Sequence, residues 1–387
     1  MSDNWTTALS RYAARLHATA EGRHHIASPL GAWLLLALAA SAAPASSDET
    51  DDFADALGVS PKQAADVAAA LLAEPHPLVA AATAVWHAAG ADGLAGWALP
   101  EPTTAGPLPS KAELDAWARE HTYGLIETFP GEPAPDLLLL LASALATRVS
   151  WTEPFTPAPA AELGGAWSER LTTVLRTPEH GHQAFITSTA EAGDVIVHVA
   201  PAGGLSVVSV AAAPDVTPER VMAAAYTIAL APRPDRTSLF DLPLGETPLW
   251  TIREERRHER RTEFLTALLP AWSAQSDHDL AADPGLGFPA VTRVLGRLMN
   301  APAGRFDAKQ TAVARYSRFG FEAAAVSAYM YPTSMPPETA VRYAELRFGH
   351  AYAVVAVTEQ PEGPWHGVPV FSGWVSEPED VPEQDLD

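Results

Sequence analysis

The chain has 387 residues, 47% of them hydrophobic, so it is long enough to bury a large core and to form two or three domains. Its formal net charge of −22 would repel nucleic-acid phosphates and anionic lipid, so we expect no nucleic-acid partner and no membrane association. The absence of cysteine excludes disulfides, thiolate metal ligands and a cysteine nucleophile, and it fits a reducing compartment.

The first residues predict a helix followed by a short strand. Residues 24–28, HHIAS, are strand-like. Before them, apolar residues recur at helical spacing and predict an amphipathic helix. These residues are Trp5, Leu9, Tyr12, Ala13 and Leu16.

The stretch PLGAWLLLALAASAAPA, which begins at Pro29, imitates a secretory signal. It starts too late in the chain, however, and the positively charged flank of such signals is nearly absent. It is also too short and too rich in alanine to span a bilayer. We interpret the segment from Leu30 to Ala43 as a buried helix, and we expect a cytoplasmic protein.

The next segments alternate between helix and strand patterns. Residues 51–74 predict one or two helices with acidic starts, and residues 78–89 predict a buried strand. A proline-rich connector at 99–110 leads into a predicted helix over 111–129. The apolar run at 136–151 fits either a helix or a central strand, because periodicity cannot separate the two.

Strand patterns dominate the later part of the chain. Residues 194–200 and 205–212 flank the turn sequence PAGG and predict a hairpin, and residues 352–358 and 368–375 predict a second one. The tail SEPEDVPEQDLD is acidic, and we expect it to be solvated. Helices early and strands late favour an α+β fold with a large sheet.

Charged motifs give only weak functional signals. Glu179, His180 and His182 place three potential metal ligands within four residues, but in a predicted loop this is weak evidence and we expect no metal. The run from Arg253 to Arg261 has five arginines and three glutamates. It could recruit an anionic partner, although a solvated, internally paired face is the commoner role. No glycine-rich phosphate loop, G-x-S-x-G or H-E-x-x-H motif is present, and we expect no cofactor.

Six stretches, taken in chain order, resemble the serpin family. Ser28-Pro29 resembles the start of that family's buried helix, and Trp151 lies in a stretch similar to the central strand of its main sheet. No single motif is decisive, but their order along nearly the whole chain is. The stretches are IASPLGAWLLLALAASAA (26–43), AAATAVWH (80–87), LDAWAREHTYGLI (114–126), LLLASALATRVSWTEPF (139–155), SMPPE (334–338) and PVFSGWVSEP (369–378).

The resemblance implies a serpin-like α+β fold with a helix-rich N-terminal half. That fold has a large mixed or antiparallel sheet, smaller sheets and about eight helices. The resemblance makes the apolar run at 136–151 a strand. It also implies a single domain over residues 1–378 followed by an acidic tail at 379–387, and we expect a monomer.

The resemblance also implies a reactive loop. In serpins a target protease cleaves this exposed loop, which then inserts as a new central strand of the main sheet and drags the covalently attached protease along. The cleaved bond would be Thr333-Ser334 or Ser334-Met335, depending on the end from which the loop is counted. The hinge would consist of Arg318, Gly320, Phe321, Glu322, Ala323, Ala324, Ala325, Val326, Ser327 and Ala328. The protease's upstream subsites would bind Tyr329, Met330, Tyr331 and Pro332.

Several hinge residues differ from the family pattern. Strand alternation puts Phe321 on the face that insertion would bury, where inhibitory members keep a small residue. Forcing a ring into a packed sheet costs about 1–3 kcal/mol, enough to slow insertion about tenfold or more. Arg318 stands where the family has an acidic residue. Further along the same face lie Ala323, Ala325, Ser327, Tyr329 and Tyr331.

The resemblance assigns Ser28, Ser143, Trp151 and Gln310 to the gate and breach that control opening of the main sheet. Here too the chain departs from the family. Ser143 replaces the usual asparagine, Gln310 falls near the usual histidine, and Gly31 replaces a second serine.

These observations leave two functional hypotheses. The first is an inhibitor of a chymotrypsin-, elastase- or subtilisin-like serine protease, because neither Thr333 nor Ser334 suits a trypsin-like pocket. In this case no residue of the chain is catalytic. The second is a serpin scaffold that no longer inhibits, and that binds a small molecule or peptide or has gained a biosynthetic reaction. For such a reaction, Glu179, His180, His182 and tyrosines near the loop are the possible acids and bases.

We predict that a broad protease such as elastase or subtilisin makes its first cuts between Tyr329 and Met335. The reason is that the resemblance makes this segment an exposed loop. Mass spectrometry of limited digests measures the cut sites. First cuts confined to the connector at 99–110 would count against an exposed reactive loop.

Overall fold

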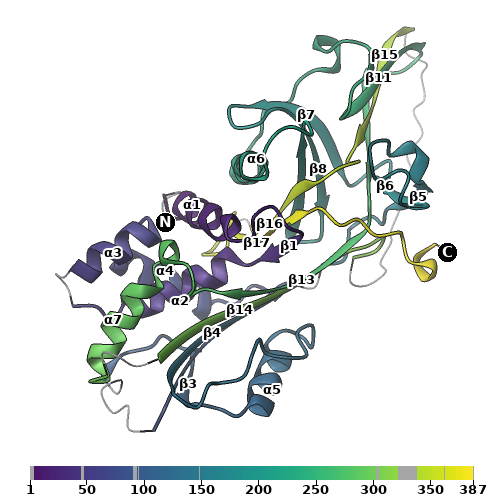
Figure 1. The fold of residues 1–387 in the computed structure, drawn as a ribbon. Coiled ribbons are helices and arrows are strands. Elements are labelled where there is room, and N and C mark those ends of the chain that lie inside the picture. Colours follow the sequence, from purple (N-terminus) through teal and green to yellow (C-terminus); the bar gives the residue numbers. More distant parts are fainter. Residues whose placement is uncertain are drawn as a thin grey trace.

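The structure is a computed structural model that describes residues 4–44, 48–89, 94, 96–147, 149–301, 305–320, 338–360 and 362–386. Within these residues it contains seven α-helices and seventeen strands, and the strands form three sheets (Figure 1). The predicted α+β class is therefore confirmed. None of the helices in the described ranges combines the length and apolarity needed to cross a membrane.

Five helices gather at one end of the molecule (Figure 1). The central one, α2, is buried along its whole length, as predicted, and Ser28 caps its N-terminus. The segment at 51–74 forms two helices, because Ser60 caps a second helix that starts at Pro61. The five are α1 (Asn4–Ala18), α2 (Pro29–Ala40), α3 (Asp48–Leu57), α4 (Pro61–Ala73) and α7 (Phe288–Leu298).

A five-stranded sheet lies beside these helices. The apolar run at 136–151 is its central strand, as the resemblance predicted. Polar and apolar residues do not alternate along this strand because both of its faces are buried. Leu139 and Leu141 face the main core, while Leu140 packs under α5. The strand order is β13 (Trp272–Asp279), β14 (Arg305–Tyr316), β4 (Leu137–Thr147), β2 (Val79–His87) and β3 (Thr104–Pro107).

Helix α5 (Lys111–His121) covers the outer face of this sheet (Figure 1). It starts with a capping box between Ser110 and Glu113, and its Trp117 ring lies 5.1 Å from the Trp86 ring of β2. The prediction that the helix continues to residue 129 is wrong. The helix ends at His121 because Tyr123 and Gly124 adopt positive φ angles.

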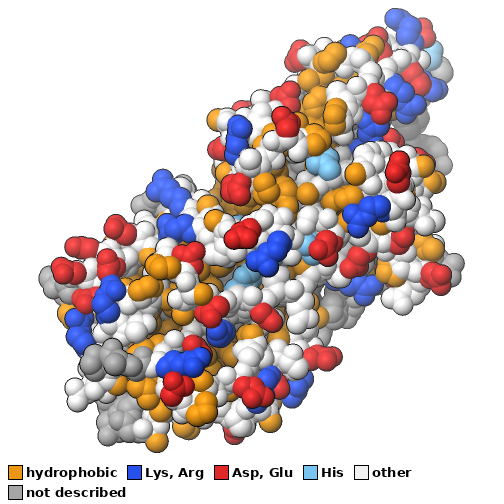
Figure 2. Space-filling model, in the orientation of Figure 1, with side chains coloured by type: hydrophobic (Ala, Val, Ile, Leu, Met, Phe, Trp, Pro, Cys, Tyr) orange, Lys and Arg blue, Asp and Glu red, His pale blue; other side chains and the backbone are white. Residues whose placement is uncertain are grey.

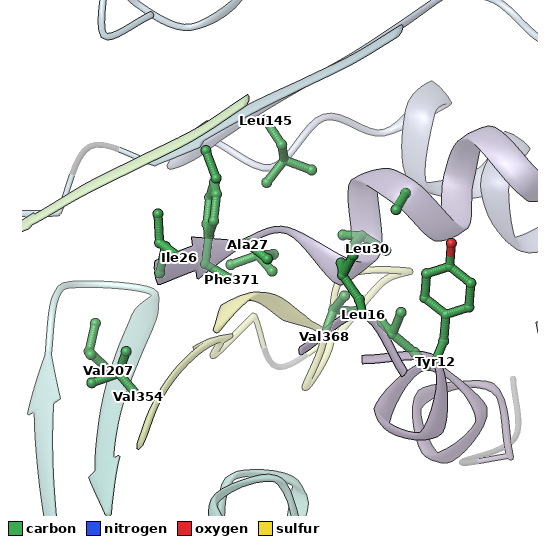
Figure 3. Packing of buried hydrophobic residues seen from close by; sticks show 14 of the residues in the cluster. Tyr12, Leu16, Ile26, Ala27, Leu30, Leu145, Val207, Val354, Val368 and Phe371 are labelled. Atoms are coloured by element: carbon green, nitrogen blue, oxygen red, sulfur yellow. The ribbon is translucent and has the colours of Figure 1, made fainter. Parts of the chain in front are cut away.

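A six-stranded sheet packs its inner face against the five-stranded sheet. Figure 3 shows Ile26 and Phe371 of this sheet pointing toward Leu145 of β4. Helix α6 (Pro218–Leu230) covers its outer face. Both predicted hairpins, β8–β9 and β16–β17, are confirmed. The order is β1 (His25–Ala27), β17 (Pro369–Val375), β16 (Tyr352–Thr358), β9 (Leu205–Ala212), β8 (Gly193–Pro201) and β7 (Gln183–Thr189).

The third sheet carries the arginine-rich run. Side chains of residues 253–261 are exposed, as predicted for a solvated face. Arg257 pairs with Glu255 within the run, whereas Glu254 pairs across to Arg342 of β15. Figure 2 shows basic and acidic side chains intermixed at this end of the molecule. The order is β10 (Gly245–Glu246), β11 (Trp250–Arg257), β15 (Thr339–Arg347), β12 (Glu263–Leu269), β6 (Thr173–Arg176) and β5 (Thr156–Pro159).

The acidic side chains of the C-terminal tail are mostly exposed, as predicted, but the tail also docks onto the body of the protein. Glu379 forms an antiparallel bridge with Ala271, and Val381 is buried. A carboxylate oxygen of Asp380 accepts hydrogen bonds from the backbone N–H groups of Thr172 and Thr173. The docking was not predicted, because it depends on one apolar side chain and on backbone pairing within a segment whose acidic side chains stay in solvent.

Candidate functional site

The two central strands of the five-stranded sheet separate at one end. Parallel pairing of β14 with β4 runs from Arg305 and Leu137 to Gln310 and Ser143, and then stops. Beyond that point β4 remains paired with β2 and β14 remains paired with β13. Each strand therefore keeps a partner on its outer side, and no strand of the described residues pairs with the inner edge that it presents to the other.

A cavity of about 340 Å³ lies between these separated ends. Val313, Arg315 and Thr147 line it from the two strands, and Leu125 lines it from the loop after α5. Its floor is the inner face of the six-stranded sheet. Four of the floor residues are labelled in Figure 3: Ile26, Val207, Val354 and Phe371.

The chain turns back on itself at the rim of this cavity, directly after β14. Gly320 has a φ of 77° and bridges antiparallel to Ser150, just beyond the end of β4. A Cβ at Gly320 would lie 2.2 Å from the carbonyl oxygen of Val149, so only glycine fits this position. The turn at 317–320 thus directs the chain antiparallel to β4.

Trp151 and Arg318 hold this turn in place. The Trp151 indole N–H donates to the carbonyl oxygen of Ser317 at 2.9 Å, and its backbone N–H donates to Phe319 at 3.2 Å. Arg318 stands where an acidic residue was expected, and here its guanidinium donates to backbone carbonyl oxygens. Its Nε lies 3.2 Å from the oxygen of Phe155, and its Nη1 lies 2.7 Å from that of Asp385.

Below the cavity, Gln310 clamps β14 to the start of α2. Its side-chain oxygen accepts from the backbone N–H of Ser28 at 2.9 Å, and its Nε2 donates to the Ser28 carbonyl at 2.8 Å. The Ser28 hydroxyl donates to the carbonyl oxygen of Val370 in β17 at 2.8 Å. This clamp is buried and lies where the pairing of β4 with β14 ends.

Ser143 and Gly31 complete this cluster. A Cβ at Gly31 would lie 3.0 Å from the Ser143 hydroxyl, 3.1 Å from Gln310 Nε2 and 3.3 Å from the Ser28 hydroxyl. The Ser143 hydroxyl is buried and has no hydrogen-bond partner among the described residues. The structure therefore brings three of the four predicted gate and breach residues, Ser28, Ser143 and Gln310, together around Gly31. The fourth, Trp151, lies at the turn instead.

A cluster of rings surrounds the base of the turn. Trp151 packs on Tyr316, and Phe155 packs on both His182 and His198. Nδ1 of His182 is 3.1 Å from Nε2 of His198, and Nε2 of His182 donates to Glu153 O at 2.8 Å. Burial lowers the pKa of His182 to about 4 and holds that of His198 well below its ordinary value.

This arrangement also shows where the three potential metal ligands between Glu179 and His182 lie. Both ring nitrogens of His182 make hydrogen bonds within the cluster, whereas Glu179 and His180 are exposed. Across the described ranges no group of three or more histidine or acidic side chains is arranged to hold a metal ion. Within the described residues, the motif therefore supplies one half-buried histidine and no set of metal ligands.

A buried hydrogen-bonded chain was not predicted from the sequence. The Tyr226 hydroxyl is 2.8 Å from the Ser372 hydroxyl, which is 2.6 Å from His17 Nε2, and His17 Nδ1 is 2.7 Å from His25 Nε2. Burial lowers the pKa of His25 to about 4. The chain links α6, β17, α1 and β1, the strand directly before Ser28. The pair His24-His25 was its only local signal, and spacing could not reveal partners so distant in sequence.

The remaining predicted site residues lie outside the described residues. They are the hinge residues Phe321, Glu322, Ala323, Ala324, Ala325, Val326, Ser327 and Ala328, the subsite residues Tyr329, Met330, Tyr331 and Pro332, and the reactive-bond residues Thr333, Ser334 and Met335. Of the predicted hinge, the structure describes Arg318 and Gly320.

Comparison with known proteins identifies the fold. No model of a protein family and no curated protein matches the sequence. Solved structures do match over nearly the whole chain. The thermophilic serpin tengpin in its native state is 12% identical with a TM-score of 0.65, and the match covers 97% of this chain and 95% of that one.

Two further serpin-fold structures show the same likeness. Human thyroxine-binding globulin, solved with its ligand, is 13% identical with a TM-score of 0.62, over 97% of this chain and 98% of that one. A serpin from the trematode Schistosoma haematobium is 12% identical with a TM-score of 0.61, over 97% and 100%. The chain therefore has the serpin fold, as its sequence motifs predicted.

We predict that Gln310→Met lowers the free energy of unfolding by about 2–4 kcal/mol. Methionine keeps the volume of the side chain but leaves the buried backbone N–H of Ser28 unpaired, at about 1–3 kcal/mol. It also removes one hydrogen bond, worth about 0.5–1.5 kcal/mol, from the Ser28 carbonyl, which still accepts from the N–H of Ala32. Chemical denaturation measures the loss. Gln275→Met, on an exposed position of β13, is the matched control and should change stability by less than about 0.5 kcal/mol. An equally small change for Gln310→Met would show that the clamp does not stabilise the fold.

We predict that the protein loses stability as the pH falls from about 6.5 towards 4. The folded pKa of His182 lies at about 4, below its ordinary value of 6.5, so the unfolded state binds more protons throughout this window. The full contribution of about 3 kcal/mol is present above pH 6.5 and is lost as the pH approaches 4. Denaturation at pH 7 and pH 5 measures it. His182→Gln should reduce the difference between the two pH values, whereas the exposed control His180→Gln should not. Equal pH dependence in all three proteins would contradict this assignment.

Proposed function

We propose that the chain inhibits a serine protease of the chymotrypsin, elastase or subtilisin type by cleavage and insertion of its reactive loop. The proposal extends the serpin fold to a mechanism that the fold alone does not establish. Solved neighbours with this fold include an insect serine protease inhibitor and the thyroxine-binding globulin. Because these neighbours differ in function, the proposal rests on the geometry of this chain's own described residues.

The main supporting observation is that no strand of the described residues lies between the separated ends of β4 and β14. Pairing stops at Ser143 and Gln310, and a cavity of about 340 Å³ separates the strands beyond them. The turn at Gly320 already directs the chain antiparallel to β4 at the rim of this cavity. A strand that continued from there would meet two unpaired backbone edges. This geometry supports insertion of the residues that follow.

The magnitudes indicate that Phe321 acts on the rate of insertion more than on its outcome. Each hydrogen bond to β4 or β14 contributes about 0.5–1.5 kcal/mol. Several such bonds outweigh the cost of about 1–3 kcal/mol for one oversized ring. The ring enters first, however, so its cost adds to the barrier before later bonds form. A slow insertion gives the acyl-enzyme time to hydrolyse.

A hollow of about 1340 Å³ favours small-molecule binding as a second candidate function. It lies beside the end of α6 and the six-stranded sheet, with an apolar floor that includes Phe185, Val208 and Ile228. Arg233 and Glu359 lie among the residues that line it. Such a site suits an amphipathic small molecule. The thyroxine-binding globulin, which has the same fold, supports the idea that this scaffold can carry such ligands.

We predict that Phe321→Thr increases the yield of a detergent-stable covalent complex with a chymotrypsin-like or subtilisin-like protease. A small residue lowers the barrier at the first step, so insertion outruns hydrolysis of the acyl-enzyme. Gel electrophoresis after incubation with a protease panel measures the covalent band against the cleaved band. Phe319→Thr, two residues earlier in the described turn, is the matched control and should not raise the yield.

Two outcomes would contradict parts of this proposal. A nearly equimolar covalent band from the wild-type chain would show that Phe321 is no obstacle. Absence of any covalent band from both proteins, with the loop demonstrably cut, would refute inhibition. A rise in melting temperature with a panel of amphipathic small molecules would then favour the second candidate.

A further inference from the structure

The C-terminal segment forms a strap, defined here as residues 376–386, that docks onto the body of the protein. The backbone N–H of Glu379 donates to the carbonyl of Ala271 at 2.7 Å, next to the start of β13. Asp380 accepts from the backbone N–H groups of Thr172 at 2.6 Å and of Thr173 at 2.9 Å. With Val381 buried beside them, these contacts fix the first part of the strap.

The far end of the strap contacts the turn at 317–320. The carbonyl oxygen of Asp385 accepts a hydrogen bond from Nη1 of Arg318 at 2.7 Å, and Nε of the same guanidinium donates to Phe155 at 3.2 Å. The guanidinium carbon also lies 4.7 Å from the centre of the Phe319 ring. One side chain therefore joins the strap, the segment after β4 and the turn itself.

The hydrogen bonds of Arg318 are suited to fixing the orientation of the turn at 317–320. Both described acceptors are backbone carbonyl oxygens, each approached by a different nitrogen of one planar group. Among the described residues, the backbone N–H groups of Trp151 and Phe155 and the Trp151 indole also bond the turn to the segment after β4, and Gly320 bridges to Ser150. Loss of a bond at Arg318 is therefore expected to loosen the turn at the rim of the cavity without unfolding it.

We propose that the strap is a latch that acts through Arg318 to hold the turn in the orientation from which a strand enters between β4 and β14. This inference rests on the proposed function, since it names the regulation of that same site. Arg318 is a positioning residue in this scheme and takes no part in protease chemistry. Any partner or cleavage that detached the strap would release the turn and reduce inhibition.

A truncated chain tests the latch. Ending the chain after Pro382 removes the Asp385 carbonyl but keeps the contacts of Glu379, Asp380 and Val381. Asp385→Ala is the matched control, because it keeps the backbone carbonyl that Arg318 contacts. Arg318→Met removes both guanidinium hydrogen bonds and therefore gives the largest loosening of the turn expected from loss of this contact.

Hydrogen exchange provides a readout that needs no protease. We expect amides at 151–155 and 317–320 to exchange about five- to tenfold faster in the truncated chain, and faster again in Arg318→Met. Asp385→Ala should match the wild type. We also expect a smaller covalent share and a larger cleaved share for the truncated chain, with a protease that the wild-type or Phe321→Thr background traps.

The outcomes separate this inference from the proposed function. Unchanged exchange in the truncated chain would overturn the latch, whatever the protease assay gives. Faster exchange with an unchanged covalent share would also overturn it, because the strap would then not govern insertion. Faster exchange in a chain that traps no protease in any background would confirm that the strap positions the turn and would refute the inhibitory mechanism.

Discussion

The structure depends on a β-sheet whose two central strands pair along only part of their length. A parallel ladder joins β4 to β14 up to Ser143 and Gln310, and beyond these residues the described part of the chain pairs each strand with its outer partner alone. Unpaired backbone edges inside a protein are costly, so a sheet in this state is stabilised by admitting another strand. The cavity, the turn and the clamp all lie at this separation.

The N-terminal segment connects the point where β4 and β14 separate to the rest of the core. Ser28 contacts Gln310 of β14 and Val370 of β17, so it ties the five-stranded sheet to the six-stranded sheet. Strand β1 leads directly into Ser28, and its His25 belongs to the buried chain that reaches α1 and α6. The polar gate and the buried histidines therefore act on one short strand. A substitution in either group is therefore expected to alter the pairing of β4 with β14.

Local patterns predicted five of the seven described helices and both hairpins, because burial of one face or of a whole element leaves a visible pattern in the sequence. They gave no prediction for α6, α7 or most strands of the third sheet. The prediction of β4 as a strand needed the family resemblance, since burial on both faces removes the alternation of polar and apolar residues. The gate positions also came from the resemblance, and the structure brings Ser28, Ser143 and Gln310 together around Gly31. The end of α5 was missed because it depends on the positive φ of Tyr123. The docked tail and the chain from Tyr226 to His25 were missed because their partners are distant in sequence.

We propose that the segment after Gly320 can enter between the ends of β4 and β14, where the described residues place no strand. The most direct test is the melting temperature of the Phe321→Thr chain before and after cleavage of its loop. The account predicts a rise of more than about ten degrees, well beyond the effect of one added contact, because a central strand is gained. Equal melting temperatures of the intact and cleaved chains would contradict it.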